Sequence, residues 1–304
     1  MTAPKFTVPI YVCINLLSSF LRNDSNPGLA TKSVIAGGVF NIFGDYFCVF
    51  TLDMGIRGAG IATAMGAGIS TLVMLTHFFK KSNTLRLQFS KEIFRLFGRI
   101  TVNGFSSFII DVAMGVLTML FNRRIMKYLG TDALAVYGVI VSVSTLVQCC
   151  SYGIGQASQP IISQNYGAGN VGRIKKMLRY NIITAAIFGA VWAVIAFAVP
   201  NGLIRLFMTP TASVLAIAPA IIRIYGSSFL LLPFNVYSTY YFQATMRAKT
   251  SMFVSVARGI LISGALILII PVTLGADMIW WAMPVTELVV AVFAGAMMAK
   301  KIQP

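Results

Sequence analysis

Three acidic residues stand inside long apolar stretches of the sequence, where an unpaired charge is unfavourable. They are Asp45, Asp111 and Glu287. Asp111 lies halfway along "NGFSSFIIDVAMGVLTMLF", and its apolar neighbours favour a protonated carboxyl group. Such a group can alternate between a proton and a cation, which makes Asp111 the candidate ion-binding residue. The structural alternative is a carboxylic acid that hydrogen-bonds Ser106, Ser107 or a neighbouring helix.

Other polar side chains accompany these acids. Asn41 precedes Asp45 by four residues, so the two side chains face the same side of a helix. This pair predicts either the lining of a polar cavity or a polar clamp between helices. Glu287, Arg223 and Arg258 also fall inside apolar stretches, and Arg258 is expected to extend its charged end toward water.

The composition indicates what surrounds these residues. Hydrophobic residues make up 57% of the 304-residue chain and charged residues 11%, whereas a soluble domain carries about 25% charged residues. Long windows without charge cannot cover a soluble core, so lipid is the predicted solvent. The formal charge is +16. Because Lys and Arg cluster in short gaps between apolar stretches, the pattern is typical of cytoplasmic loops rather than of nucleic-acid binding.

A membrane-spanning helix needs about 20 mainly apolar residues. Eight stretches meet that length, with Phe6–Leu21 as a shorter ninth, and Pro233 should kink the sixth. The sequence therefore predicts an all-α membrane protein, a polytopic helical bundle of about nine transmembrane segments. The eight stretches are Ser33–Leu52, Gly58–Phe79, Thr101–Phe121, Ala133–Ile154, Tyr180–Val199, Ala212–Tyr241, Met252–Val272 and Met278–Met298.

The Lys and Arg residues also predict orientation, because positively charged loops stay in the cytoplasm. One set of alternate gaps holds sixteen of them and the other set holds five. The segment between Lys80 and Arg99 and the C-terminus are therefore predicted to be cytoplasmic. Apolar residues recur at helical spacing in residues 81–100, which predicts an amphipathic linker. This linker would join an N-terminal part, residues 1–80, to a C-terminal part, residues 101–304.

The stretch "GQASQPIISQNYGAGN" follows an apolar run and precedes a basic segment. Its two glutamines lie near the inner edge of the membrane, where their amides can bridge helices or face a watery vestibule. Pro160 lacks a backbone N–H, and Gly167 and Gly169 permit a tight reversal at positive φ. We expect a helix–loop junction at an inner gate, with direct substrate contact as the alternative. The residues of this junction are Gln156, Gln159, Pro160, Asn165 and Gly167.

The single histidine and the four cysteines predict neither a metal site nor a disulfide framework, because their spacing fits neither. His77 and Asp24 lie where apolar stretches meet charged gaps, and both are expected to be solvated. The sequence also lacks the motifs of metalloproteases, serine hydrolases and nucleotide-binding loops. Neither an enzyme nor a cofactor is expected.

Several well-separated motifs resemble those of one membrane-protein family. "GIGQASQPIISQNYGAGNVGRIKK" is similar to a Gly- and Gln-bearing helix end with its following loop. "NIFGD" and "GIRGAGIATAMG" are similar to the family's fifth and sixth helices, and "YFQATMRAKTS" to its turn between helices ten and eleven. On these motifs the chain resembles a multidrug and toxic compound extrusion (MATE) transporter over nearly its whole length. The resemblance implies the last three helices of a six-helix N-lobe and a complete six-helix C-lobe, with about three N-terminal helices missing.

The resemblance also implies a function. A MATE transporter of the plasma membrane exports cationic or amphiphilic drugs by alternating access, in antiport with H⁺ or Na⁺. Asp111 aligns with an acid of helix seven that couples ion movement to export in some members. A second acid, in helix ten of some members, has no counterpart, because Phe234 and Asn235 occupy that stretch. The expected cavity-lining residues are Asn41, Asp45, Phe234 and Asn235.

Two other functions stay open on the sequence. A lipid-linked oligosaccharide flippase of the same superfamily would need Arg or Lys in its cavity, where only Arg223 and Arg258 are candidates. A fragment without transport activity is the second alternative. The expected partners are small organic cations or amphiphiles and membrane lipid, with no nucleic acid and no obligate protein partner.

Overall fold

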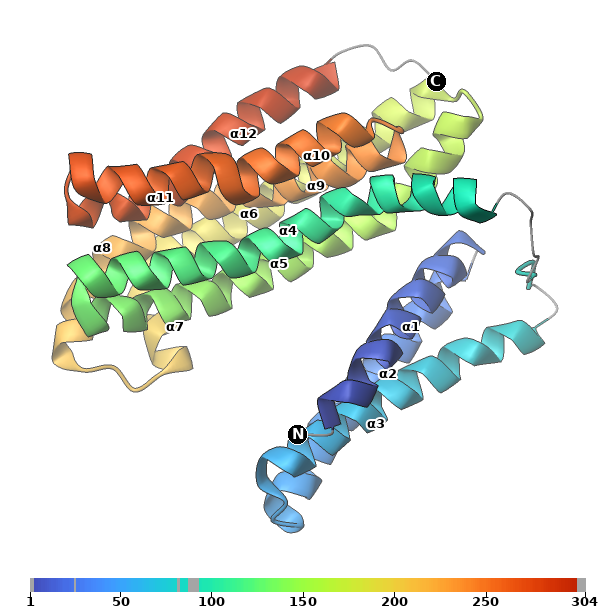
Figure 1. Cartoon of the computed structure of the whole chain (residues 1–304), viewed down its shortest axis with the longest axis horizontal. Coiled ribbons are helices and arrows are strands. Elements are labelled where there is room, and N and C mark those ends of the chain that lie inside the picture. Colours follow the sequence, from blue (N-terminus) through green and yellow to red (C-terminus); the bar gives the residue numbers. More distant parts are fainter. Residues whose placement is uncertain (1–2, 25, 81–82, 87–92, 300–304) are drawn as a thin grey trace. The chain divides into compact units, whose positions relative to one another are not determined.

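The computed structural model describes residues 3–24, 26–80, 83–86 and 93–299. Every regular element in these residues is a helix or a helical turn (Figure 1). The chain divides into two compact units, residues 1–91 and residues 92–304. They are called unit 1 and unit 2 below, and each is described by itself.

The division between the units falls inside the predicted amphipathic linker, residues 81–100. Residues 81–82 and 87–92 of that linker lie outside the described part of the chain. The helix that follows begins at Ile93, so the last part of the predicted linker is continuous with a long helix of unit 2.

Unit 1 is built from three long helices. Its elements are α1 (Ala3–Asn23), α2 (Pro27–Tyr46), η1 (Phe47–Thr51), α3 (Gly55–Leu75) and η2 (Thr76–Phe79). Asn26 caps α2, since its side chain accepts a hydrogen bond from a backbone N–H in the first turn. Large side chains form only a small core, which consists of Leu21, Ala30 and Met74.

Small residues instead hold α2 and α3 together. A Cβ added to Gly66 would lie 2.6 Å from the carbonyl oxygen of Gly37, and one added to Gly44 would lie 3.0 Å from the Cβ of Ala62. Such close approach of two backbones is how helices pack in lipid, where large apolar side chains gain little from leaving the solvent.

Unit 2 is a larger helical bundle. Its elements are α4 (Ile93–Tyr128), α5 (Gly130–Gly167), α6 (Val171–Ala198), α7 (Pro200–Phe207), α8 (Ala212–Gly226), η3 (Ser227–Leu230), α9 (Leu232–Ala244), α10 (Ala248–Val256), η4 (Ala257–Leu261), α11 (Ile262–Thr273), η5 (Ala276–Trp281) and α12 (Ala282–Ala299). Aromatic rings meet in its main core, where Phe121 stacks on Tyr137 with ring centroids 4.9 Å apart. Tyr225 and Trp280 pack beside them.

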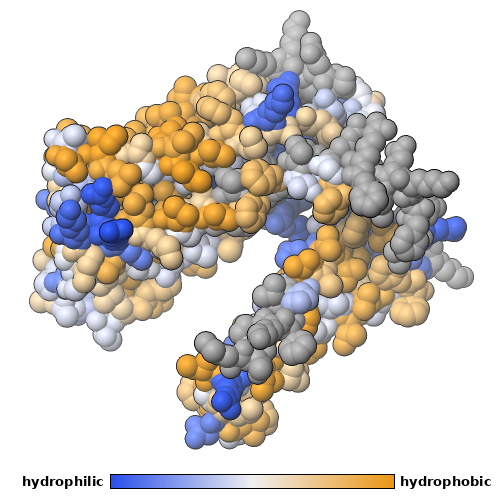
Figure 2. Space-filling view, viewed as in Figure 1, coloured by the Kyte–Doolittle hydropathy of each residue, from blue (hydrophilic) through white to orange (hydrophobic). Residues whose placement is uncertain are grey.

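The outer surface is apolar as well. Phe43 in unit 1 is 70% exposed and Val194 in unit 2 is 64% exposed, and apolar atoms cover much of the visible face of unit 2 (Figure 2). Within the described residues, seven helical segments are long and apolar enough to cross a membrane. The chain is therefore a multi-pass membrane protein with a helical-bundle fold. Because α1 and α4 are not among the seven, the count of nine spans stays a prediction.

One predicted helix break is present, and one predicted boundary differs from the structure. The predicted break near Pro233 is present, as η3 and the residue after it separate α8 from α9. The span predicted to end at Ile154, however, continues as α5 through Pro160 to Gly167. The turn is therefore shorter than expected, and in it Gly169 has positive φ (69°).

Candidate functional site

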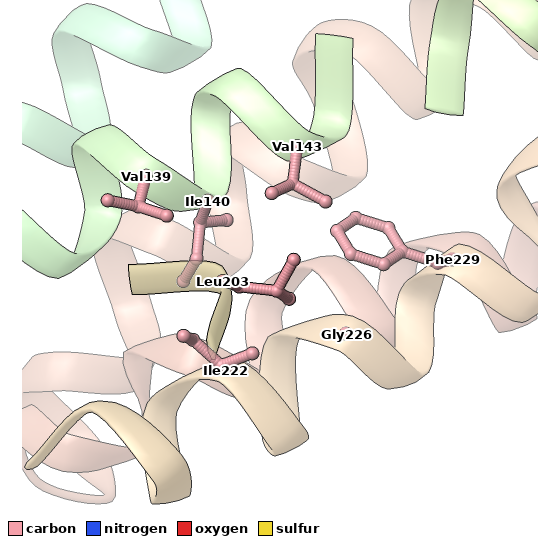
Figure 3. Close-up of a pocket in the computed structure, with 7 residues that line it drawn as sticks. All are labelled: Val139, Ile140, Val143, Leu203, Ile222, Gly226 and Phe229. Atoms are coloured by element: carbon pink, nitrogen blue, oxygen red, sulfur yellow. The ribbon is translucent and has the colours of Figure 1, made fainter. Parts of the chain in front are cut away.

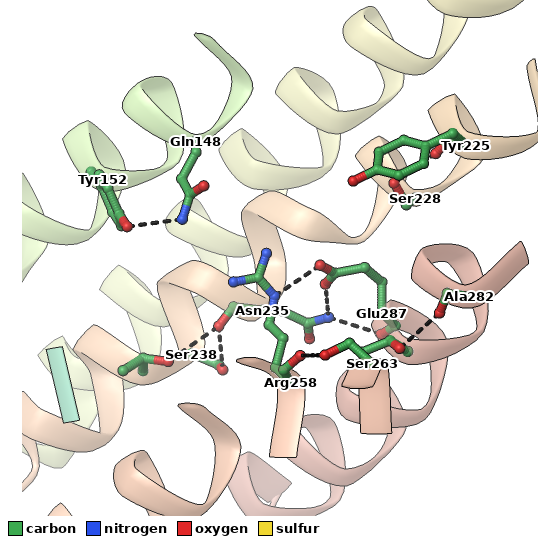
Figure 4. Close-up of polar contacts among 12 residues, drawn as sticks. Gln148, Tyr152, Tyr225, Ser228, Asn235, Ser238, Arg258, Ser263, Ala282 and Glu287 are labelled. Carbon is green, nitrogen blue, oxygen red and sulfur yellow. Dashed lines mark hydrogen bonds and ion pairs between the residues drawn. The ribbon is translucent and has the colours of Figure 1, made fainter. Parts of the chain in front are cut away.

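Three polar side chains from three elements of unit 2 meet in its interior (Figure 4). Arg258 Nε donates to Glu287 Oε1 at 2.8 Å. Asn235 Nδ2 donates to Glu287 Oε2 at 2.6 Å and to the Glu287 carbonyl oxygen at 2.8 Å. Glu287 and Asn235 have no exposed surface and Arg258 is 8% exposed. We call Asn235, Arg258 and Glu287 the interior cluster.

Local sequence positions each member of the interior cluster. Asn235 lies in the first turn of α9, which begins at Leu232, with Pro233 as its second residue, directly after the helical break. Arg258 lies in η4, a π-helical turn within the span Ala248–Thr273, and Ser263 Oγ donates to the Arg258 carbonyl oxygen at 2.7 Å. This wider turn changes which side of the helix faces the bundle, and π-turns are frequent at functional sites.

The interior cluster is electrically balanced, as a buried charge requires. Isolated, either charge would be costly in such a low-dielectric place, but the carboxylate and the guanidinium neutralise each other. The expectation that Arg258 extends toward water is wrong, because Glu287 holds it inside. The Asn235 Oδ1 atom is buried and has no hydrogen-bond partner. Asn235 has no exposed surface, so in this conformation its amide serves the interior cluster rather than an open cavity.

Asp111, the candidate ion-binding residue, lies in α4. Its side chain is outside the described residues, as are those of Ser106 and Ser107. The next described buried side chain along α4, Ala113, packs tightly against η4. A Cβ added to Gly259, next to Arg258, would lie 2.5 Å from the Ala113 Cβ. The helix that carries Asp111 therefore contacts the turn that carries Arg258.

The second predicted acid lies in unit 1. Asn41 Nδ2 donates to Thr63 Oγ1 at 3.3 Å, which joins α2 to α3. Asp45, one turn further along α2, is half-buried, and its Oδ1 atom is buried without a hydrogen-bond partner. Asn41 thus makes a contact between helices, whereas Asp45 keeps a carboxylate oxygen free of protein donors.

The predicted junction residues lie within a helix rather than in a loop. Gln156, Gln159, Pro160 and Asn165 belong to α5, of which Gly167 is the last residue. Gln159 Nε2 donates to Gln243 Oε1 of α9 at 3.3 Å, so this amide does bridge two helices. Asn165 Nδ2 donates to the carbonyl oxygen of Ile161 within the same helix, at 2.8 Å. Phe234 is partly buried and packs against a core cluster that includes Ile162.

A small pocket in unit 2 has a different chemistry. It lies between α5, α7, α8 and η3, and every residue that lines it is apolar (Figure 3). Such a lining offers no group that could orient a charged ligand. The lining residues are Val139, Ile140, Val143, Leu203, Ile222, Gly226 and Phe229.

Unit 1 contains an acid–base pair that the sequence analysis placed in water. His77 is fully buried, and its Nε2 atom lies 2.6 Å from Asp24 Oδ2. Thr84 donates to the same carboxylate through its backbone N–H (3.1 Å) and its hydroxyl group. These hydrogen bonds lower the pKa of Asp24, the Thr84 hydroxyl most and His77 next. The expectation that His77 is solvated is wrong.

The tautomer of His77 follows from its other neighbour. Asn26 Oδ1 accepts the hydrogen bond that caps α2, so the amide nitrogen of Asn26 faces the ring and lies 3.1 Å from His77 Nδ1. Nδ1 is then the acceptor, and Nε2 carries the hydrogen that is donated to Asp24. We call Asp24, Asn26, His77 and Thr84 the edge cluster.

Comparison with known proteins identifies the family. The MatE family model matches residues 105–269, more than half of the chain. The chain belongs to the MATE family of transporters. The multidrug export proteins MepA of Staphylococcus saprophyticus and Staphylococcus haemolyticus are 24% and 23% identical to it over 290 residues, which are 95% of this chain and 63% of each relative.

Solved MATE structures share the fold. One is the outward-facing conformation of a multidrug resistance MATE family transporter of the MOP superfamily, with a TM-score of 0.85 at 21% identity. The match covers 95% of this chain and 65% of that one. A MOP superfamily transporter from Pyrococcus furiosus, described as having a binding pocket of reverse polarity, matches with a TM-score of 0.80 at 19% identity, covering 97% of this chain and 74% of that one. The chain thus spans less than two thirds of the MepA relatives.

Proposed function

We propose that the chain forms part or all of a secondary active efflux transporter that exports cationic or amphiphilic drugs. The observation that carries this proposal is the similarity of 95% of the chain to the MepA multidrug export proteins. Antiport with H⁺ or Na⁺ by alternating access is the accompanying mechanism. It is supported by carboxyl groups that lie inside membrane-spanning helices, where ionisable residues are energetically costly and mark functional sites.

In this proposal Asp111 couples ion movement to export. A carboxyl group at mid-span can give up a proton to bind a cation, and the reverse exchange resets it. Asn41, Asp45, Phe234 and Asn235 are proposed to face the substrate in some state of the cycle. The chain's 15 Met and 22 Phe residues supply adaptable apolar contacts for such substrates. Transport of this kind needs no cofactor and no covalent catalysis.

The flippase alternative is less well supported. A transporter of anionic lipids needs cations that are free to bind phosphate. Arg258 is committed to Glu287 at 2.8 Å, and Arg223 Nε donates to the Phe197 carbonyl oxygen at 3.1 Å. The Arg258 guanidinium is therefore not positioned as an open anion site, which counts against a phosphate site at the interior cluster.

The proposal predicts that Asp111→Asn inserts normally but abolishes efflux, because the shape is kept and the ionisable proton is lost. Cells without their own efflux pumps are loaded with a fluorescent lipophilic cation, and its loss is followed. The assay uses the chain alone and the chain co-expressed with the part of the S. saprophyticus relative that it does not match. The matched control is Asp277→Asn, since Asp277 is exposed.

Efflux that persists in Asp111→Asn at the unsubstituted rate would contradict the role of Asp111. Absence of efflux in both expression formats, with normal insertion, would contradict the transport proposal itself. A protonophore distinguishes the coupling ions, because it stops H⁺-driven efflux and spares efflux that is driven by a Na⁺ gradient.

A further inference from the structure

The Glu287 carboxylate ties its own helix, α12, to two other elements. Oε1 accepts from Arg258 in η4 at 2.8 Å and Oε2 accepts from Asn235 in α9 at 2.6 Å. Glu287 has no exposed surface, so water does not replace either donor in this conformation. Any movement of α12 relative to η4 therefore changes the charge balance around this carboxylate.

Separation of the pair leaves only one chemical route to neutrality. A buried carboxylate that loses its cation is unstable and binds a proton instead. Arg258 cannot take part in that exchange, because a guanidinium keeps its charge in proteins. Its long side chain can instead turn toward water once it is released. The change in protonation must then occur at Glu287.

One of the elements that the pair joins, η4, also contacts α4. The π-turn η4 carries Arg258 and is closed by the hydrogen bond from Ser263. Gly259 admits Ala113 of α4 so closely that a Cβ would lie 2.5 Å away. A shift of α4 therefore acts on the backbone directly beside Arg258. This contact places the helix of Asp111 against the turn that holds the counter-ion of Glu287.

We propose that Glu287 is a second proton-exchanging carboxyl group, which binds a proton when α12 and η4 separate and releases it when Arg258 pairs with it again. The proton comes from water and returns to water, so no other reactant is needed. As a step of a transport cycle, this inference rests on the proposed antiport. As a property of the protein, it can be tested without transport.

The surroundings of Glu287 contain few other ionisable groups. Arg258 is its ion-pair partner, and Tyr225 of α8 interacts electrostatically with both members of the pair. A tyrosine is neutral at neutral pH and does not compete for the role of counter-ion. The helix that packs on η4 carries Asp111 in its sequence, and Asp111→Asn removes any contribution of this acid from the measurement.

The composition of the chain makes Glu287 directly observable. The whole sequence contains only two glutamates, Glu92 and Glu287. In a Glu92→Gln background, glutamate that is ¹³C-labelled at the side-chain carboxyl reports on Glu287 alone. Infrared spectroscopy of this protein in lipid separates the C=O band of a protonated carboxyl group from the bands of a carboxylate. The Glu92→Gln background leaves every residue of the interior cluster unchanged.

The expected result is a labelled protonated band that grows when the protein is acidified, because a carboxylate that is released by Arg258 binds a proton. Saturating tetraphenylphosphonium, a lipophilic cation, should shrink the band at the lower pH, because cation and proton compete in antiport. In Arg258→Gln the band should already be present at neutral pH, and Arg258→Gln/Glu287→Gln should lack it. The Asp111→Asn variant should leave the acid-induced band in place.

A labelled carboxylate that stays ionised at every pH at which the protein is folded would overturn the inference, even if Arg258→Gln fails to fold. A band that responds to pH but not to tetraphenylphosphonium would support proton exchange at Glu287 and count against the proposed drug antiport. The failure of one proposal is thus distinguishable from the failure of the other.

Discussion

Each of the two units is stabilised internally by a different kind of helix packing. Unit 2 buries large side chains around stacked rings such as Phe121 and Tyr137. Unit 1 has a much smaller core of large side chains and relies on close backbone approach at residues such as Gly37 and Gly66. The pair with a permanent cation, Arg258 with Glu287, lies in the unit that has the larger core.

The acid–base pairs of the two units also differ, because their basic partners are an arginine and a histidine. In the interior cluster the cation is an arginine, whose charge is permanent, so only Glu287 can change its protonation state. In the edge cluster the base is His77, whose ring lies between Asp24 and Asn26. Separation of α12 from η4 changes the charge balance of the first pair, whereas hydrogen bonds with Asn26 and Thr84 hold the second pair in place.

The largest expected effect comes from removing the cation of the interior cluster. Arg258→Met leaves the Glu287 carboxylate buried with the Asn235 amide but without its cation, which should destabilise unit 2 by about 3–5 kcal/mol. Arg258→Met/Glu287→Gln should regain most of that loss, since it leaves no charge behind. Unfolding in detergent, followed by circular dichroism, measures both. A double variant no more stable than the single one would show that the pair does not act as a unit.

A smaller effect is expected where the backbones of unit 1 approach each other. Gly66→Ala places a Cβ 2.6 Å from the Gly37 carbonyl oxygen, and the resulting separation of α2 and α3 should cost about 1–3 kcal/mol. Gly68→Ala is the matched control, because nothing lies within 4 Å of its added Cβ. Equal stability of the two variants would mean that α2 and α3 are not held by this contact.

Removal of His77 should cost less than the loss of Arg258, because no permanent charge is left unpaired. His77→Ala deletes a fully buried ring and leaves the Asn26 amide without its acceptor, at a cost of about 1–3 kcal/mol. His77→Gln, which can both donate and accept, should recover part of the stability. The same unfolding assay compares the variants. An unchanged stability of His77→Ala would show that the edge cluster does not stabilise unit 1.

The sequence predicted the helices well because the length of an apolar stretch reports the thickness of lipid. It predicted the end of α5 poorly, since the helix continues past Ile154 and through Pro160 to Gly167. Apolar content shows where lipid ends, whereas a helix ends where its backbone hydrogen bonds end. The helix end that was predicted around Gln159 therefore lies further along the chain, and Asn165, which was expected beside the loop, still belongs to α5.

The two clusters show what a single sequence leaves undetermined. Glu287 and Arg258 are 29 residues apart, and His77 and Asp24 are 53 apart. The opposite charges of Glu287 and Arg258 inside apolar stretches were a usable signal for the first pair. The π-turn that directs Arg258 into the bundle had no recognisable signal in the sequence. The second pair lies beside basic gaps, where solvated side chains are the usual outcome, and only the packing of η2 against the turn before α2 buries it.

The smallest expected effect is a local one, at the end of unit 1. Hydrogen bonds from Thr84 and His77 hold the pKa of Asp24 below its ordinary value of 3.8, so the folded state favours the carboxylate. The stabilisation is fully present above the ordinary value and is lost as the pH falls through the lowered one. At neutral pH the Thr84 amide, which donates to Asp24 at 3.1 Å, should therefore be protected from hydrogen exchange, and the protection should be lost as the pH falls below 3.8 and through the lowered pKa. In Asp24→Asn the amide should exchange several times faster at neutral pH, whereas Asp53→Asn, a change in the same unit at a residue with φ of 51°, should leave it protected. Hydrogen exchange of the Thr84 amide is measured by mass spectrometry and corrected for the intrinsic pH dependence of exchange. Equal protection in both variants would show that the Asp24 carboxylate does not hold Thr84.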